Sequence, residues 1–152
     1  VLLKGFLQQL TLVCLLMMTD NLIFIRVVPV KVVGGGKLRK DDWTTLDGTM
    51  TPLKGFTDFH EAPWMHKYKG KYYLSHSDNH ASTQGGNQMQ YSVSDNPLGP
   101  FTPCGVYMYP QGEETAHGSI VEYNGKWYSF YHTSNHSGRK FESCEKLGAS
   151  LW

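Results

Sequence analysis

Alternating apolar and polar residues predict two β-hairpins of the same design. In the first, residues 64–68 alternate, Lys69-Gly70 is a turn signal, and residues 71–75 return as a second strand. Residues 119–131 repeat the pattern, and Tyr68-Lys-Gly-Lys-Tyr-Tyr matches Tyr123-Asn-Gly-Lys-Trp-Tyr at an offset of 55 residues, from Tyr68 to Tyr123. A repeat of this length, made of strands and glycine turns, predicts a β-propeller with one blade per repeat.

Glu61 lies directly before the first hairpin and is the candidate acid of this sequence. Pro63 has no N–H for a ladder hydrogen bond, so it should mark the first residues of the strand and not its middle. Glu61 should then stand at a strand entrance, from which a side chain projects into a cleft. In the second repeat, the position equivalent to Glu61 is Ala116, which is next to His117. Because the first strand of a blade lines the propeller axis, we expect Glu61 and His117 to face one funnel.

Three further stretches predict strands. β-Branched residues are dense between residues 19 and 38, and we expect the glycines at 34–36 to end that strand. Pro29 lies inside the run and predicts that part of it is an edge strand or a bulge. Residues 89–94 alternate and residues 105–109 form a short strand, with a dense proline and glycine turn between them.

The length of the chain limits how much of a propeller it contains. The sequence has 152 residues, fewer than three repeats of 55, whereas propellers close with about four to eight blades. The expected fold is therefore all-β, an incomplete β-propeller of about two to three blades. Such a chain is either a fragment or a unit that closes by association. Its open strand edges would be templates for pairing, which predicts self-association.

The composition narrows the classes of partner. The net charge of +1 gives no reason to expect nucleic acid or an anionic membrane as a partner. No span reaches the roughly 20 apolar residues that a membrane helix needs. Three cysteines, Cys14, Cys104 and Cys144, show no metal-ligand spacing, and an odd number argues against a complete disulfide framework.

The N-terminal segment has two interpretations. Lys4 precedes the apolar run 10–18, which resembles the apolar region of a signal peptide. No small-residue cleavage site follows, however, and a buried strand or helix is the preferred interpretation. We therefore divide the chain into an unmatched apolar segment (1–18), a partial propeller domain (19–141) and a tail (142–152).

Three motifs in a fixed order resemble glycoside hydrolase family 43 over about residues 19–139. They are Asp58-Phe-His-Glu-Ala-Pro-Trp, Tyr91-Ser-Val-Ser-Asp-Asn-Pro-Leu-Gly-Pro and His117-Gly-Ser-Ile-Val-Glu-Tyr. The resemblance implies a five-bladed β-propeller that cuts arabinose- and xylose-containing plant polysaccharides with inversion, as α-L-arabinofuranosidases and β-xylosidases do. It implies a carbohydrate partner and no required cofactor. The expected location is secreted or periplasmic.

The resemblance also implies roles for single residues. Glu61, in Glu-Ala-Pro-Trp, matches the family's general acid. His117, in His-Gly-Ser-Ile, matches a central histidine that is expected to bind substrate, near an axial water or a structural calcium ion. Asp20 matches the aspartate that orients the acid and modulates its pKa, although Asn21 stands where proline is usual. The family's general base is an aspartate of the first blade, and residues 1–18 contain no Asp or Glu that could match it.

Inverting hydrolysis needs two carboxyl groups about 6.5–9.5 Å apart, one protonated and one ionised. We expect burial beside Pro63 and Trp64, with repulsion from Asp20, to raise the pKa of Glu61 above about 4.3. Trp64 is also expected to stack against a sugar ring. Without a base, the chain alone should hydrolyse unactivated glycosides poorly. A non-catalytic sugar-binding propeller and a propeller scaffold for protein partners remain alternatives.

Overall fold

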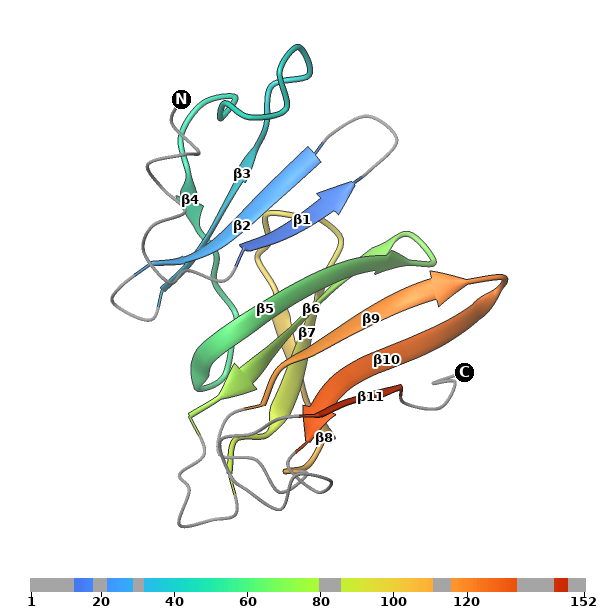
Figure 1. Cartoon of the computed structure of the whole chain (residues 1–152). Helices are drawn as coiled ribbons and strands as arrows, with labels where there is room; N and C mark the ends of the chain where they lie inside the picture. Colours follow the sequence, from blue (N-terminus) through green and yellow to red (C-terminus); the bar gives the residue numbers. More distant parts are fainter. Residues whose placement is uncertain are drawn as a thin grey trace.

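The computed structural model describes residues 13–17, 22–28, 32–79, 86–110, 116–133 and 144–147, and the regular elements of this part are all β-strands. They form three antiparallel sheets, with strand orders β1-β2-β3-β4, β5-β6-β7-β8 and β11-β10-β9 (Figure 1). The strands are β1 (Val13–Met17), β2 (Leu22–Val28), β3 (Val32–Lys37), β4 (Thr51–Pro52), β5 (Phe59–Tyr68), β6 (Lys71–Asp78), β7 (Met89–Ser94), β8 (Thr102–Met108), β9 (Gly118–Tyr123), β10 (Lys126–Thr133) and β11 (Cys144–Leu147).

The first strands of the three sheets meet at the centre of the molecule. Strand β5 contacts β1 and β2 on one side and β9 on the other, and β5 and β9 run side by side across the middle of Figure 1. Within each sheet, consecutive strands are neighbours, as in a meander. Meander sheets whose first strands meet in this way are arranged as propeller blades. The prediction of an all-β, incomplete propeller is confirmed.

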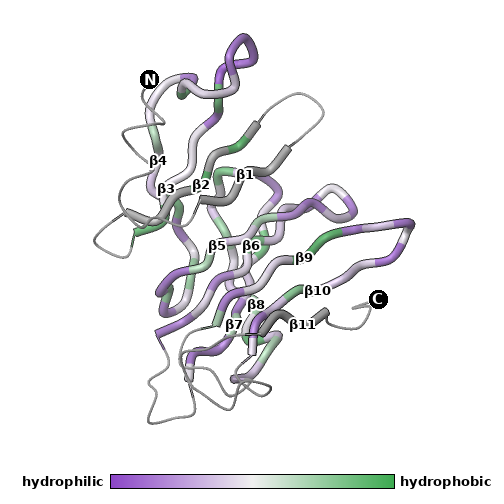
Figure 2. Tube along the Cα trace, viewed as in Figure 1, coloured by the Kyte–Doolittle hydropathy of each residue, from purple (hydrophilic) through white to green (hydrophobic). Residues whose placement is uncertain are grey.

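The two predicted hairpins are confirmed as β5–β6 and β9–β10. Both turns have two central residues with positive φ: 45° and 81° at Lys69 and Gly70, and 51° and 73° at Asn124 and Gly125. This pair of conformations is the type I′ turn, whose twist matches that of the paired strands. Figure 2 shows the tip of the β9–β10 hairpin as hydrophilic, with hydrophobic residues further along β9. The sequence repeat is therefore a structural repeat.

Residues 19–38 contribute two strands rather than one. Strands β2 and β3 pair antiparallel, and the glycines at 34–36 lie inside β3. The expectation that these glycines end the strand is therefore wrong. A Cβ added to Gly35 would lie 3.0 Å from side-chain atoms of both Leu53 and Leu98. The bare backbone lets loop side chains pack directly on the strand, which is a common reason for glycine inside a sheet.

Both ends of the chain add strands to these sheets. Strand β1, within the 1–18 segment, pairs with β2, and β11, within the 142–152 tail, pairs with β10. The domain boundaries drawn from the sequence stay predictions, and Pro29 lies outside the described residues. No helix of the described residues has the length and apolar character to cross a membrane.

The main apolar cluster lies between the first and second sheets. Strand β5 enters it through Met65, which is 2% exposed, and β6 through Leu74, which is fully buried. Full burial of a side chain of this kind contributes about 1.5–3 kcal/mol. The other buried members of this cluster are Ile23, Ile25, Val33, Leu53, Tyr72 and Phe101. This cluster holds β5 against the first sheet.

Aromatic side chains join the second sheet to the third. The ring of His66 stacks on Tyr73, with centroids 5.3 Å apart, and lies 5.1 Å from the ring of Trp127 on β10. Tyr68 meets Trp127 edge-on at 5.3 Å. Aromatic pairs at these distances add about 0.5–1.5 kcal/mol beyond their area burial. The two repeated hairpins are therefore held together by one aromatic cluster, and His66 is the member of it that titrates at acidic pH.

Protonation of His66 should weaken this contact. Burial lowers the pKa of His66 from 6.5 to about 4, and its buried Nδ1 has no hydrogen-bond partner among the residues that the structure describes. As the pH falls from 6.5 to about 4, the unfolded chain takes up a proton that the folded chain does not, so stability falls through this window. We expect the free energy of unfolding in urea to fall more steeply across this window for the native chain than for His66→Phe, which keeps a ring but cannot titrate. Parallel pH curves for the two proteins would contradict this expectation.

Candidate functional site

Strand β5 carries Glu61 at an irregularity in its pairing with β6. Glu61 pairs with Ser77, and the register shifts on both sides of it, after Phe59 and before Trp64. Ala62, next in the chain, has a φ of 57° and is 1% exposed. A positive φ in a buried alanine is a strained conformation that the surrounding packing must hold. The bulge bends the strand and sets the direction of the Glu61 side chain.

Glu61 is the third residue of β5 and does not precede the strand. Pro63 also lies inside β5, so the expectation that it marks the first residues of the strand is wrong. Its position is nevertheless consistent with its chemistry. Pro63 falls within the register shift between Glu61 and Trp64, where its missing N–H interrupts no regular ladder.

Histidines from two sheets converge on the Glu61 carboxyl group. His117 Nε2 lies 3.3 Å from Glu61 Oε1, and His60 Nε2 lies 3.8 Å from the same oxygen. The side chains of Glu61 and His117 are each 33% exposed. The ring of His132, on β10, has its centroid 5.8 Å from that of His117. The structure therefore brings Glu61 and His117 to the same end of adjacent sheets, as the repeat predicted.

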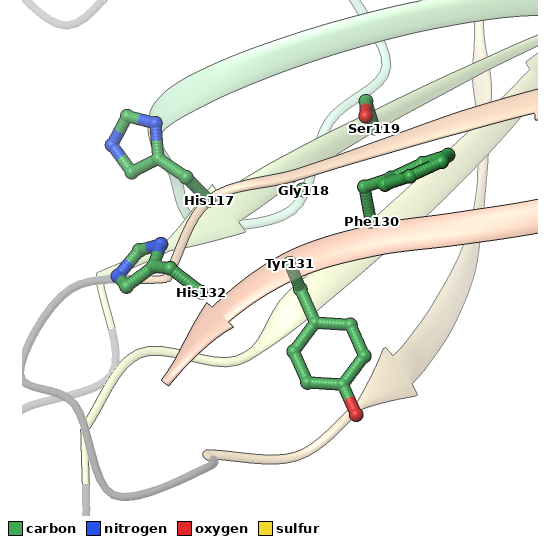
Figure 3. Close-up of a pocket in the computed structure, with 6 residues that line it drawn as sticks. All are labelled: His117, Gly118, Ser119, Phe130, Tyr131 and His132. Carbon is green, nitrogen blue, oxygen red and sulfur yellow. The ribbon is translucent and has the colours of Figure 1, made fainter. Parts of the chain in front are cut away.

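A pocket opens beside these histidines at the end of the β9–β10 hairpin. Figure 3 shows His117 and His132 side by side where β9 begins and β10 ends, whereas the ring of Tyr131 points away from them. The volume of about 370 Å³ is within the range of small-molecule sites, about 300–1,000 Å³. The pocket is lined by His117, Gly118, Ser119, Phe130, Tyr131 and His132.

The histidines hold the pKa of Glu61 below its ordinary value of 4.5. The main cause is the hydrogen bond from His117 to the charged carboxylate, and partial burial acts in the opposite direction. His60 and His132, when they carry a proton, also favour the carboxylate. The expectation of a raised pKa is therefore wrong for the described residues, which hold an ionised carboxylate at neutral pH. Asp20, which was expected to raise this pKa, lies outside them.

The pattern of glycosyl hydrolases family 43 matches residues 34–146, which include Glu61, His117 and His132. The chain belongs to glycosyl hydrolases family 43. The bulged strand and the histidine-bearing hairpin thus both lie inside the family 43 region.

Individual family 43 relatives agree with this assignment. A β-xylosidase of Xylanibacter ruminicola is 54% identical over 74 residues, 49% of this chain and 22% of that enzyme. A xylosidase/arabinosidase of Bacteroides ovatus is 50% identical over 74 residues, 49% of this chain and 21% of that enzyme. The structure of a GH43 β-xylosidase/α-arabinofuranosidase from a compost metagenome, in complex with xylotriose and calcium-free, has a TM-score of 0.75 at 25% identity.

The chain spans only part of these relatives. The superposition covers 92% of this chain but 54% of the solved enzyme, and the curated matches cover about a fifth of each enzyme. Because almost the whole chain superposes, its three sheets are blades of the family 43 propeller. The family resemblance predicted this five-bladed type, of which the described residues form a part.

The described residues do not fit the calcium ion expected at His117. Calcium takes about six to eight oxygen ligands, whereas His117 offers a nitrogen, and that nitrogen already contacts Glu61. Among the residues that the structure describes, no three His, Cys, Asp or Glu side chains are grouped so that they could hold a metal ion. The calcium ion therefore stays a prediction, and none of the chemistry below involves it.

Two histidines of the site, His60 and His132, were not assigned a role from the sequence. The position of His132 beside His117 could have been predicted from the two-residue turn of the second hairpin, which sets the register of its strands. This register pairs Gly118 with Tyr131, and one step further along it brings His117 opposite His132. His60 was not recoverable in this way, because the bulge in β5 changes which side chains share a face.

Trp64 has a structural partner in the described residues. Its indole Nε1 donates a hydrogen bond of 2.8 Å to the carbonyl oxygen of Ile120 on β9, and its ring packs against the core cluster of the first two sheets. Trp64 therefore ties β5 to β9, the two strands that bring Glu61 and His117 together. Stacking of Trp64 on a sugar stays a prediction.

Loss of this bond should loosen the contact between the sheets. We expect Trp64→Phe to lower the free energy of unfolding by about 0.5–1.5 kcal/mol, because it removes a hydrogen bond while keeping an aromatic ring. Trp43→Phe is the matched control, since Trp43 is 45% exposed and should tolerate the change. Urea denaturation compares the two variants, and equal stabilities would show that the indole bond does not hold the sheets together.

Proposed function

We propose that this chain is part of an inverting family 43 glycoside hydrolase in which Glu61 is the general acid. The observation that carries the proposal is the placement of its carboxyl group at the pocket end of two adjacent blades. His117 Nε2 and His60 Nε2 approach Oε1 to 3.3 and 3.8 Å, and the Glu61 side chain is 33% exposed. A partly exposed carboxyl group in this position can donate a proton to a bound glycosidic oxygen.

The proposed substrates are xylose- and arabinose-containing oligosaccharides and plant polysaccharides. The curated relatives are named β-xylosidase and xylosidase/arabinosidase, and the solved relative is in complex with xylotriose. In the pocket, Phe130 is 43% exposed and offers an apolar surface to a sugar ring, beside the polar groups of Ser119 and His132. Because the polymeric substrates lie outside the cell, we further propose a secreted or periplasmic location.

In the proposed reaction, Glu61 protonates the leaving oxygen while a water molecule attacks the opposite face of the sugar. The carboxyl group must therefore be protonated when substrate is bound. Its pKa has to rise as the sugar displaces water and as a second carboxylate, proposed to be Asp20, comes near. In the described part, three histidines act on the charge of Glu61. We place the general base outside the described residues.

One observation favours a second candidate, a non-catalytic sugar-binding propeller. The lowered pKa keeps Glu61 ionised at neutral pH, and an ionised carboxylate accepts hydrogen bonds from sugar hydroxyls but donates none. Such a protein would bind xylotriose without cutting it. For a scaffold that binds protein partners, the described residues offer no comparable observation.

The role of Glu61 can be tested on this chain. We expect the 152-residue chain to hydrolyse xylo-oligosaccharides slowly, and azide to raise the rate, because azide is already an anion and needs no base. Glu61→Gln should lower the azide-dependent rate by about 10²–10⁴-fold on oligosaccharides. The loss should be much smaller on aryl xylosides, whose leaving group needs little protonation. Product release is the measurement.

The matched control for this substitution is Glu122→Gln. Glu122 is exposed on β9, so its loss should leave both rates at the native level. Equal losses on oligosaccharides and aryl xylosides in Glu61→Gln would show that Glu61 is not the acid. Calorimetric binding of xylotriose by a native chain that turns over neither substrate would support the sugar-binding alternative.

We also propose that the chain self-associates through its open strand edges. Strand β8 is the outer strand of the second sheet, and an edge strand presents unpaired N–H and C=O groups to a second chain. Pro103 lies in this strand and removes one of its donors. Cys104, next to it, is exposed and carries a free thiol in the part of the chain that the structure describes, so it is an accessible position on the edge.

A charge at Cys104 should oppose association. We expect light scattering after gel filtration to show larger species as the concentration of the native chain rises. Cys104→Lys should move this transition to higher concentration, because lysine on an edge discourages pairing. Cys104→Ser removes the thiol without adding charge, so it should behave as the native chain does, which would exclude a disulfide through Cys104 as the cause. A native chain that stays monomeric throughout would refute the proposal.

A further inference from the structure

The segment that leads from the first sheet into β5, residues 53–58, is held in place although it belongs to no strand. At its start, the Leu53 N–H donates a hydrogen bond of 2.8 Å to the carbonyl oxygen of Val33 on β3. One residue later, the carbonyl oxygen of Lys54 accepts a hydrogen bond of 2.9 Å from the Phe101 N–H. This segment, which we call the linker, is therefore bonded to the first sheet and to the end of the turn between β7 and β8.

The closest approach in the linker is at Gly55. Its φ is 95°, and an added Cβ would overlap the carbonyl oxygen of Phe101 and lie 3.0 Å from the Phe101 Cα. These are backbone atoms, which cannot rotate away as the end of a flexible side chain can. Glycine is the residue that permits both this conformation and so close an approach. Any other residue at this position would push the linker and the turn apart.

The turn on the other side of this contact, residues 95–101, is braced by its own hydrogen bonds. The Asn96 side-chain oxygen accepts a bond of 2.9 Å from the Leu98 N–H, and the Asn96 carbonyl oxygen accepts one of 2.9 Å from the Gly99 N–H. The Asn96 N–H donates to Ser94 Oγ at 3.0 Å. Side-chain bonds of this kind are the reason asparagine is favoured in turns. Gly55 therefore packs against a braced turn.

This turn is part of the second sequence motif, and it touches the first sheet as well as the linker. In Figure 1 the connection between β7 and β8 reaches the first sheet. The Leu98 side chain would lie 3.0 Å from a Cβ added to Gly35 on β3. Phe101 is 4% exposed and belongs to the apolar cluster between the first two sheets. The motif thus holds the linker against both sheets.

The rest of the linker is fixed up to the first residue of β5. The Phe56 ring lies 5.3 Å from the ring of Phe101 and 6.0 Å from that of Phe59, where β5 begins. The carbonyl oxygen of Asp58 accepts a hydrogen bond of 3.1 Å from the Asn79 N–H. A displacement of the linker is therefore passed on to the first residues of β5, among which the candidate acid lies.

We propose that Gly55 is a positioning residue for the acid: its close contact with Phe101 fixes where β5 begins, and so where the Glu61 carboxyl group lies relative to His117. The catalytic meaning of this inference rests on the proposed function of Glu61, whereas the placement itself does not. The pocket is lined by His117 and by residues of β9 and β10. Displacing β5 should therefore misplace the acid and leave the pocket.

Gly55→Ala tests the proposal, and Gly48→Ala is its matched control. The two glycines have nearly the same φ, 95° and 98°, so alanine meets the same backbone strain at both positions. At Gly48, however, an added Cβ meets nothing within 4 Å among the described residues. A difference between the two variants therefore reports the contact with Phe101 and not the strain of a positive φ.

The first readout is the azide-dependent rate on two kinds of substrate. We expect Gly55→Ala to lower kcat on xylo-oligosaccharides by about 10²-fold, the loss that a misplacement of about 1 Å can cause, with KM unchanged. On aryl xylosides, whose leaving group needs little protonation, the loss should be much smaller. A mere decrease in the folded fraction would lower both rates equally. Gly48→Ala should keep the native ratio of the two rates.

The second readout is NMR of the histidine rings at one pH, which requires no activity. The ring signals that move in Glu61→Gln belong to histidines near the acid. We expect the same signals to move in Gly55→Ala and to stay at their native positions in Gly48→Ala. Lower stability alone would not move them, because they are signals of the folded chain.

The proposal is overturned if Gly55→Ala leaves these ring signals and the ratio of rates at their native values, or if Gly48→Ala changes them equally. If Gly55→Ala does not fold, Phe56→Leu replaces it, since leucine keeps an apolar side chain but loses the ring contacts of the linker. It should move the same signals by a smaller amount, and unmoved signals would overturn the proposal. If the signals move in Gly55→Ala but Glu61→Gln shows no dependence on the leaving group, the proposed function fails and the placement of Glu61 by Gly55 is supported.

Discussion

Strand β5 is packed on both faces, and the position of every other feature of the site depends on this. Met65 points into the apolar cluster shared with the first sheet, whereas His66 and Tyr68 pack against Trp127 of the third. Trp64 adds a hydrogen bond across to β9. A strand held on both sides cannot slip in register without losing both sets of contacts. The bulge at Glu61 is therefore fixed in place, and so is the direction of the carboxyl group.

In the site, this fixed carboxyl group lies beside histidines that favour its ionised form. Acid catalysis requires the protonated form instead. A hydrogen bond from His117 stabilises the ionised form, but a general acid must carry a proton. The two requirements are compatible if the same hydrogen bond orients the carboxyl group and if substrate and a second carboxylate raise its pKa. In the described residues the orienting element is present, and the elements that would raise the pKa are not. The chain covers only about half of the length of its solved relative. The presence of some elements of the site and the absence of others from the described residues are consistent with this partial coverage.

Sequence patterns were reliable where local chemistry decides the structure. The Lys69-Gly70 and Asn124-Gly125 turns need positive φ at both central positions, and few residues supply it, so the hairpins could be read directly. Sequence patterns gave wrong predictions where contacts with residues distant in the sequence decide the local conformation. The glycines at 34–36 end no strand because loop side chains pack onto them. Pro63 lies within a strand because a bulge accommodates it.

The sequence by itself determined the all-β class, the repeated hairpins and the approach of Glu61 to His117, because turn chemistry and a regular repeat are local properties that add up along the chain. Only the tertiary structure decided how those two side chains interact. The pKa of a carboxyl group depends on the atoms within a few ångströms of it, and here those atoms come from β5, from the start of β9 and from β10. The same is true of Trp64, whose partner at Ile120 is set by the packing of one blade against the next.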